Sequence, residues 1–402
     1  MTALRHIIMV MPVMQGGGAE RVAALLLNTF QQQGIKTEFV LTSCAADRVL
    51  RSDLDASIPL HILQEQLPKR TLARKIRDFA LRLYSSLFCR LYEWLGRPVP
   101  AHFAYCSFIC QYRWEVVALH EFLKARPQAT ALAFLQPSIP MLLLAARGLP
   151  NKVVISERGN PERLMVKRYG LPFIRAYYGR ADAAVFQTNA ARECYPANVS
   201  SKGTVIPNPL KDNLSEPYIG KRNKNITTFC RISIQKNLPL LVRAFARLYQ
   251  DHPDYRLRII GDTSNHEGQL VRQQLMESIQ QLGLSDAVDM LPFSKNVHKD
   301  ILQDAMYVNS SDYEGISNAM LEAMAIGLPV ICTDCPIGGA RAMIKHGENG
   351  LLVPVNDDEK LYEAMKLLVE DLAFAQQISS HAVHIRKVLD IKTIADLWLK
   401  VL

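Results

Sequence analysis

The sequence predicts an α/β fold of two domains, each built around a mostly parallel sheet. Apolar segments of strand length alternate with stretches at helical spacing along the 402-residue chain, which is 49% apolar and 21% charged. This composition is typical of a globular protein, and the length allows two full cores. A Pro-Asn-Pro stop at 207–209 and the polar stretch that follows it, to Lys224, separate the two alternations.

The first expected elements form a unit of strand, glycine loop and helix. A strand is predicted at 7–14, and Gly16, Gly17 and Gly18 follow it before a helix that ends at Gly34. Glycines at such a junction let the backbone approach a ligand. The loop lacks the Lys-Ser/Thr pair of a P-loop, which argues against an NTPase.

The other strands of the N-terminal half are short apolar segments. Glu157 and Arg158 come directly after one of them, at the carboxyl edge where parallel sheets bind ligands. These two side chains are expected to contact acceptor or donor or, as the structural alternative, to pair with each other. The predicted strands lie at 37–41, 130–134, 153–156, 183–187 and 203–206.

Two cations follow the first strand of the C-terminal half, which is predicted at 227–232. Arg231 and Lys236 are five residues apart and precede a predicted helix from 238 to 249. A planar guanidinium fork and a compact ammonium charge together suit a diphosphate. Further strands are expected at 257–261, 288–291 and 351–353, and a helix at 269–282.

A strand, turn, helix and second strand are predicted within residues 307–336. The turn precedes a helix N-terminus whose free backbone N–H groups attract anions or sugar hydroxyl oxygens. These amides are expected at Gly315, Ile316, Ser317 and Asn318.

Glu314 and Glu322 flank this helix N-terminus, eight positions apart. On a helix this spacing places them on roughly the same face, about 12 Å apart along the axis. The simpler interpretation of such a pair alone is two solvated surface side chains. The glycine, the turn and the buried strand after them favour a binding site instead.

The spacing of Glu314 and Glu322, followed by the sequence EAMAIGLPV, resembles the retaining nucleotide-sugar-dependent glycosyltransferases of GT-B fold. The resemblance is to the large fourth family, of bacterial surface-polysaccharide type. It is strong over 227–355 and absent from 51–129. It implies two Rossmann-like domains facing a cleft: an acceptor-side domain at 1–208 and a nucleotide-sugar domain at 209–385. A C-terminal helix, 386–402, is implied to return to the N-terminal domain.

The resemblance also implies roles for single residues. Glu314 contacts the donor sugar and Glu322 holds the nucleotide ribose. Arg231 and Lys236, with the amides of the glycine loop, stabilise the departing diphosphate, although Cys230 stands where the family has glycine. The predicted site comprises catalytic Glu314, Arg231 and Lys236; donor-binding Gly16, Gly17, Gly18, Asn296, Val297, Gly315, Ile316, Ser317, Asn318 and Glu322; and the cleft residues Glu157 and Arg158.

The expected activity is transfer of a hexose or N-acetylhexosamine from a nucleotide sugar, expected to be UDP-linked, to a lipid-linked saccharide in surface polysaccharide synthesis. Neither a cofactor nor a metal is expected, because the family uses cationic side chains and helix dipoles instead. Two alternatives stay open: a GT-B nucleotide-sugar epimerase and a non-catalytic nucleotide-sugar-binding protein.

Positive charge is concentrated in the N-terminal half. Residues 1–210 hold 26 Lys/Arg against 14 Asp/Glu, and the rest of the chain holds 21 against 24. The densest part, 69–97, has eight basic and two acidic residues beside an apolar stripe at helical spacing. It is predicted either as a surface helix packed on a core or as an interfacial helix on an anionic membrane. Nucleic acid is not expected, since no module for it accompanies the charge.

The predicted location is the cytoplasm, peripherally on the inner face of the cell membrane. The apolar start of the chain leads straight into glycines, which predicts a first strand rather than a secretion signal. The eight cysteines are scattered, and the lone CxxC of Cys332 and Cys335 is interpreted as buried packing in a reducing compartment.

Overall fold

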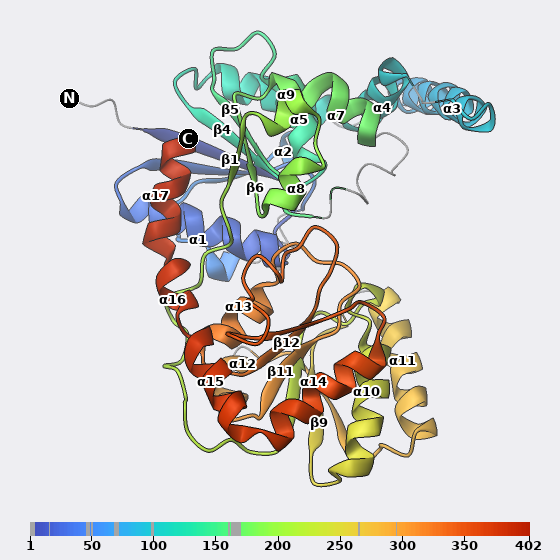
Figure 1. Ribbon diagram of the computed structural model, residues 1–402. Helices are drawn as coiled ribbons and strands as arrows, with labels where there is room; N and C mark the ends of the chain where they lie inside the picture. The colour runs from blue at the N-terminus through green and yellow to red at the C-terminus, as the bar shows by residue number, and fades with distance from the viewer. Residues whose placement is uncertain are drawn as a thin grey trace. The chain divides into compact units, whose positions relative to one another are not determined.

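The computed structural model describes residues 5–15, 17–45, 49, 51–67, 72–97, 100–159, 161, 170–263, 266–294 and 296–402. The chain divides into two compact units, drawn in Figure 1. Unit 1 contains 1–209 together with 391–402, and unit 2 contains 210–390. The first boundary lies one residue after the predicted one. The second lies five residues after it, since the buried Leu389 accepts a hydrogen bond from the Leu210 amide within unit 2.

Unit 1 is built on a parallel sheet with the strand order β3-β2-β1-β4-β5-β6-β7. The predicted strands are all present, and the structure adds the three-residue β3, which is too short to show a pattern in the sequence. Its strands are β1 (His6–Met11), β2 (Lys36–Leu41), β3 (Leu60–Ile62), β4 (Thr130–Phe134), β5 (Val153–Ser156), β6 (Ala183–Phe186) and β7 (Gly203–Val205).

Helices connect these strands, as parallel pairing requires. The α4–α5 layer packs on the sheet through Leu119, Leu123 and Ile139, which are fully buried. The helical elements described in unit 1 are α1 (Gly18–Gln32), η2 (Arg51–Asp53), α2 (Leu63–Gln66), α3 (Leu72–Trp94), α4 (Ala101–Lys124), α5 (Ser138–Ala145), α7 (Gly170–Tyr177), η3 (Tyr178–Arg180), α8 (Asn189–Glu193), α9 (Ala197–Ser200) and α17 (Ile391–Val401).

The C-terminal helix α17 belongs to unit 1, as the predicted fold requires, and lies beside α1 (Figure 1). Trp398 is fully buried and stacks on Phe134 of β4, with ring centroids 5.4 Å apart. Arg5 donates a hydrogen bond of 2.9 Å to the carbonyl of Leu399. Trp398 lies 264 positions after Phe134, and an aromatic anchor of this size explains why so distant a helix returns to the first sheet.

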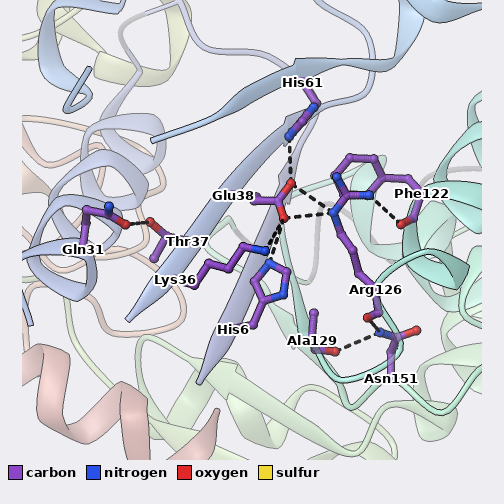
Figure 2. A network of polar contacts seen from close by, with 10 residues as sticks. All are labelled: His6, Gln31, Lys36, Thr37, Glu38, His61, Phe122, Arg126, Ala129 and Asn151. Atoms are coloured by element: carbon purple, nitrogen blue, oxygen red, sulfur yellow. Dashed lines mark hydrogen bonds and ion pairs between the residues drawn. The ribbon is translucent and has the colours of Figure 1, made fainter. Parts of the chain in front are cut away.

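A buried carboxylate joins several elements of unit 1 (Figure 2). Glu38 of β2 accepts hydrogen bonds from His6 and His61, each at 2.8 Å. Both of its carboxylate oxygens also accept from Nε of Arg126, at 2.9 and 3.0 Å. Burial alone would raise the pKa of Glu38, but the Arg126 guanidinium and His6 outweigh burial and hold this pKa below its ordinary value. Burial, with help from nearby Lys36, also lowers the pKa of His6.

We expect Glu38→Gln to lower the free energy of unfolding by about 3 kcal/mol at pH 7, because Arg126 loses its carboxylate partner. A lowered folded-state pKa means that Glu38 stabilises the protein above its unfolded pKa of about 4.3 and that this contribution is lost as pH falls further. Thermal melts of both proteins between pH 7 and pH 3 should therefore converge in acid. An equal difference at every pH would contradict the ionised state of Glu38.

Unit 2 is built on a second parallel sheet, with the order β10-β9-β8-β11-β12-β13. Its described strands are β8 (Asn225–Phe229), β9 (Arg256–Ile260), β10 (Val288–Leu291), β11 (Met306–Asn309), β12 (Val330–Thr333) and β13 (Leu351–Val353). Its described helical elements are η4 (Ile234–Lys236), α10 (Leu238–Asp251), α11 (His266–Gln281), α12 (Val297–Asp300), α13 (Asn318–Ala325), α14 (Asp358–Glu370), α15 (Leu372–Ala382) and α16 (Ile385–Val388). Two parallel α/β units of this kind constitute the predicted GT-B fold.

Candidate functional site

The loops after β8 and β11 meet at the carboxyl edge of the second sheet. Gln235 donates a 2.8 Å hydrogen bond to the carbonyl of Tyr313, and its own carbonyl accepts from the Asp312 amide at 3.0 Å. The Ser310 hydroxyl donates to the carbonyl of Lys236 at 2.9 Å. β8 and β11 are neighbours in the sheet, so their loops leave it side by side. These contacts hold the Lys236 segment against the Glu314 segment.

Lys236 and Glu314 form a direct, largely buried ion pair. The Ser311 hydroxyl donates a second hydrogen bond to the same carboxylate oxygen, at 3.0 Å. Burial by itself disfavours the ammonium, but the Glu314 carboxylate outweighs burial and raises the pKa of Lys236. Lys236 is thus a fixed positive charge next to the carboxylate predicted to face the sugar.

Asn237 positions the Lys236 loop at the start of α10. It adopts a left-handed backbone with φ of 41°, and its side chain accepts a hydrogen bond from the Leu240 amide as the helix N-cap. Its amide group donates to Asp312 at 2.6 Å and to Asn356 at 2.8 Å. Asparagine is one of the few residues that tolerate this conformation. One side chain therefore sets the turn, starts the helix and anchors the opposite loop.

The helix N-terminus lies slightly later than predicted. α13 begins at Asn318, and Ser317 is its N-cap, whose hydroxyl accepts a 3.4 Å hydrogen bond from the Met320 amide. Gly315 and Ile316 therefore belong to the turn before the helix rather than to its first residues. The difference arises because the Ser317 hydroxyl caps the helix, and apolar periodicity alone does not reveal the position of the cap.

The backbone of Gly339 packs closely against the turn that carries Glu314. This glycine was not identified from the sequence. A Cβ at Gly339 would lie 1.6 Å from the carbonyl oxygen of Gly315 and 2.4 Å from its carbon. Only a glycine allows this approach of two backbone segments. The GG pair at 338–339 was the signal that could have found it.

The CxxC segment supports the same turn. Thr333 and Cys335 donate hydrogen bonds of 2.5 and 3.0 Å to the carbonyl of Ser311. Cys332 and Cys335 are buried free thiols. Burial raises the pKa of Cys335 to about 11, so the thiol stays protonated at neutral pH. This agrees with the interpretation of the motif as packing.

Glu322, predicted to hold the ribose, lies on α13 and is buried. His298 donates from Nε2 to its Oε2 at 2.7 Å, and the ammonium of Lys211 lies 3.9 Å from its other oxygen, Oε1. His298 was not identified from the sequence. It lies next to Val297, which was, and a histidine in that segment was the available signal.

Three predicted residues of unit 2 remain, namely Arg231, Asn296 and Val297. Arg231 is exposed, and within the residues that the structure describes it makes no hydrogen bond or ion pair. Asn296 is the N-cap of α12, and its backbone N–H donates to the Ser294 hydroxyl at 3.1 Å. The Val297 side chain is buried, so any ligand contact there is through the backbone.

The glycine loop of unit 1 differs from the prediction in one respect. Its amides were expected to serve the donor diphosphate, yet Glu20 already accepts hydrogen bonds from the amides of Gly17, at 3.0 Å, and Gln15. Gly18 is the first residue of α1, and Gly16 lies outside the described residues. The Glu20 carboxylate closes the loop because it follows the N-cap by three residues, as in a capping box.

Glu157 and Arg158 are both buried in unit 1. Glu157 accepts hydrogen bonds of 2.9 Å from Tyr178 and from Gln136. Arg158 donates to Asn208 at 2.6 Å, and its guanidinium lies 5.7 Å from the ring of Trp398.

Their environment favours a structural role over the predicted ligand contact. Burial lowers the pKa of Arg158 to about 9. Arg158 is only 6% exposed. Its guanidinium, which follows β5, binds Asn208 near the end of residues 1–209 and lies over Trp398 of α17. Contact with each other, the structural alternative, is not their main interaction either, because each has its own partners.

The amphipathic helix predicted within 69–97 is present as α3, but its apolar stripe is exposed. The stripe side chains of Ile76, Phe79, Leu83 and Leu87 are between 52% and 68% exposed, and Trp94 on the same helix is 81% exposed. The other side of α3 packs on α4, where Phe88 stacks on Phe103 with centroids 5.1 Å apart. In the described residues no helix is both long and apolar enough to span a membrane.

The family model "Glycosyl transferases group 1" matches residues 213–384. An exopolysaccharide phosphotransferase of Streptomyces coelicolor is 30% identical over 60% of this chain and 25% of its own. The chain thus spans a quarter of the length of that relative.

A second relative comes from Campylobacter jejuni. It is the N-acetylgalactosamine-N,N'-diacetylbacillosaminyl-diphospho-undecaprenol 4-alpha-N-acetylgalactosaminyltransferase, which is 28% identical over 60% of this chain and 67% of its own. Among solved structures, HepE of Anabaena in complex with UDP superposes with a TM-score of 0.73 over 98% of both chains, at 17% identity. Residues 213–384 therefore match the glycosyl transferases group 1 model, and the chain as a whole has the two-unit GT-B fold.

Proposed function

We propose that this protein is a retaining, metal-independent glycosyltransferase that moves a hexose or N-acetylhexosamine from a UDP-sugar to a lipid-linked saccharide. The observation that carries the proposal is the Lys236–Glu314 pair, held at the carboxyl edge of the second sheet near α13. The name of the Campylobacter relative, a glycosyltransferase with an undecaprenol-linked substrate, supports the acceptor class. The UDP in the HepE structure supports the donor class.

The chemistry follows from the charges in unit 2. When the bond from the sugar to the diphosphate breaks, negative charge grows on the leaving phosphate. Lys236 and Arg231 are cations that stabilise this charge without a metal ion. Glu314 positions the sugar and stabilises the positive charge of the oxocarbenium-like ring. The acceptor hydroxyl attacks from the face that the diphosphate leaves, which retains the configuration.

The test is to incubate the full chain with UDP-, GDP- and dTDP-sugars, with and without undecaprenyl-diphosphate-linked saccharide and with and without EDTA. Release of UDP only with the lipid-linked acceptor, insensitive to EDTA, and an α-linked product from an α-linked donor are expected. A released isomer of the sugar without transfer would indicate an epimerase. Binding without turnover under all conditions would indicate a non-catalytic protein.

We further propose that α3 attaches the enzyme to the cytoplasmic face of an anionic membrane. Arg77 and Arg90 are exposed on the same helix as the apolar stripe. An apolar face with a basic border is the pattern of an interfacial helix. Lys and Arg near an anionic surface contribute about 1 kcal/mol each, and the sequence has six of them in 69–82.

Replacing Phe79 and Trp94 with serine should weaken binding to vesicles of phosphatidylglycerol and phosphatidylethanolamine at least tenfold, because each aromatic ring that leaves water contributes about 1.5–3 kcal/mol. The measurement is co-sedimentation over a salt series. Serine at Leu372 and Val388, apolar side chains of unit 2 that are 68% and 51% exposed, is the matched control.

Two results would count against the membrane. One is wild-type binding that neither the paired change on α3 nor salt affects. The other is a concentration-dependent dimer in light scattering that the same pair of changes abolishes, which would make the stripe an interface between two copies.

A further inference from the structure

The Glu322 carboxylate has its orientation set by a residue outside the predicted site. His298 Nε2 lies 2.7 Å from Oε2, and both residues are more than nine-tenths buried. A carboxylate can only accept hydrogen bonds when ionised, so the imidazole hydrogen lies on Nε2. Lys211 approaches the other oxygen, Oε1, at 3.9 Å.

Packing alone gives no reason for a histidine at position 298. Its ring lies edge-on to Phe229, with centroids 5.7 Å apart and planes at 84°. An apolar ring could fill that place. A buried imidazole costs free energy unless it is hydrogen-bonded, and Nε2 is hydrogen-bonded to Glu322. The polar function of His298 is therefore directed at this carboxylate.

The two residues come from different elements that frame one end of the sheet. Glu322 is in the middle of α13, and His298 is in the one-turn helix α12, which leads through a short turn into β11. A glutamate on a helix has several rotamers of its own. A hydrogen bond from a separate, packed element selects one of them before a ligand binds, which removes the entropic cost of ordering it.

We propose that His298 is a positioning residue that holds Glu322 in the orientation in which its carboxylate receives the ribose hydroxyls of the donor nucleotide. This rests on the proposed function, since it takes Glu322 as the ribose ligand. His298 itself does not contact the nucleotide. Its effect is therefore confined to the part of the binding energy that depends on the ribose hydroxyl groups.

The test compares the binding of UDP, 2′-deoxy-UDP and 3′-deoxy-UDP by titration calorimetry. Wild type should prefer UDP, and Glu322→Ala should remove the preference. His298→Phe keeps a ring against Phe229 but lacks the donor, and it should weaken UDP about tenfold and each deoxy analogue, which retains one ribose hydroxyl, by clearly less. His298→Gln, whose amide reaches the place of Nε2, should restore most of the preference.

Two controls separate positioning from general damage. His61→Phe removes a similar histidine–glutamate hydrogen bond in unit 1, at 2.8 Å, and should lower the melting temperature without changing the preference for UDP. The double change of His298→Phe with Glu322→Ala should bind UDP no more weakly than Glu322→Ala alone. If His298→Phe does not fold, His298→Asn, whose amide matches Nδ1 instead of Nε2, serves as the second variant.

The outcomes are distinct. Failure of wild type to bind UDP or any other nucleoside diphosphate, together with no donor turnover, overturns the proposed function and this inference with it. A preference for UDP that Glu322→Ala abolishes but His298→Phe leaves intact overturns this inference alone. Equal losses for UDP and both deoxy analogues in His298→Phe also overturn it, because they would indicate a structural role.

Discussion

Lys236→Ala is expected to lower kcat by about 10²- to 10³-fold, the usual effect of removing one preorganised group that stabilises transition-state charge. Lys236 is a nearly buried ammonium whose pKa is raised by Glu314, against the effect of burial. It therefore stays charged throughout the neutral range. The charge that it faces appears mainly when the diphosphate leaves, so kcat should fall more than KM rises.

The same change also leaves the Glu314 carboxylate without its cation, which is expected to cost about 3–5 kcal/mol of stability. The double variant Lys236→Ala with Glu314→Gln separates the two effects. It should recover much of the lost stability, measured by calorimetry, but none of the lost turnover.

The matched control is Lys224→Ala, which removes an exposed lysine paired with Asp254 and should change neither quantity by much. Full turnover per folded molecule in Lys236→Ala would show that the lysine has only a structural role.

Gly339→Ala is expected to reduce kcat/KM about 100-fold without unfolding the protein. The new methyl group would overlap the Gly315 carbonyl, 1.6 Å from its oxygen. The methyl group is fixed to the backbone of residue 339 and the carbonyl belongs to the backbone of Gly315, so no side-chain rotation can relieve the overlap. The turn that carries Glu314 must therefore move. Displacement of a catalytic group by about 1 Å costs on the order of 100-fold in rate.

The measurement is steady-state kinetics beside a thermal melt. The stability cost should resemble that of overpacking, about 1–3 kcal/mol. Arg341→Ala in the same segment removes a surface ion pair with Asp334 and should have little effect on either. Activity of Gly339→Ala within twofold of wild type would mean that the turn adapts and that its position is not critical.

Local sequence patterns were sufficient for the architecture of both units. Strand and helix periodicities depend on residues a few positions apart, which is why the segment at 130–134 and the Lys236 loop before α10 were predicted with nearly correct bounds. Glu314 and Glu322 could be predicted as a pair because they too are only eight positions apart. The parallel sheets followed, because helices between successive strands leave no other pairing.

Contacts between distant segments could not be predicted in this way. The ion pair of Lys236 with Glu314 joins residues 78 positions apart. No periodic pattern in the sequence predicts the close approach of Gly339 to Gly315. For the same reason the sequence left open whether Arg158 contacts a ligand or has a structural role, and the structure buries it beside Asn208 and Trp398.

The amphipathic pattern of α3 shows the same division. Its spacing predicted a helix with one apolar face, and it left open whether that face meets a core or solvent. The structure turns Phe79 and Trp94 outward and packs Phe88 on α4. The energy of an apolar side chain depends on what covers it, and the covering residues come from elsewhere in the chain, so burial is decided only when the tertiary structure forms.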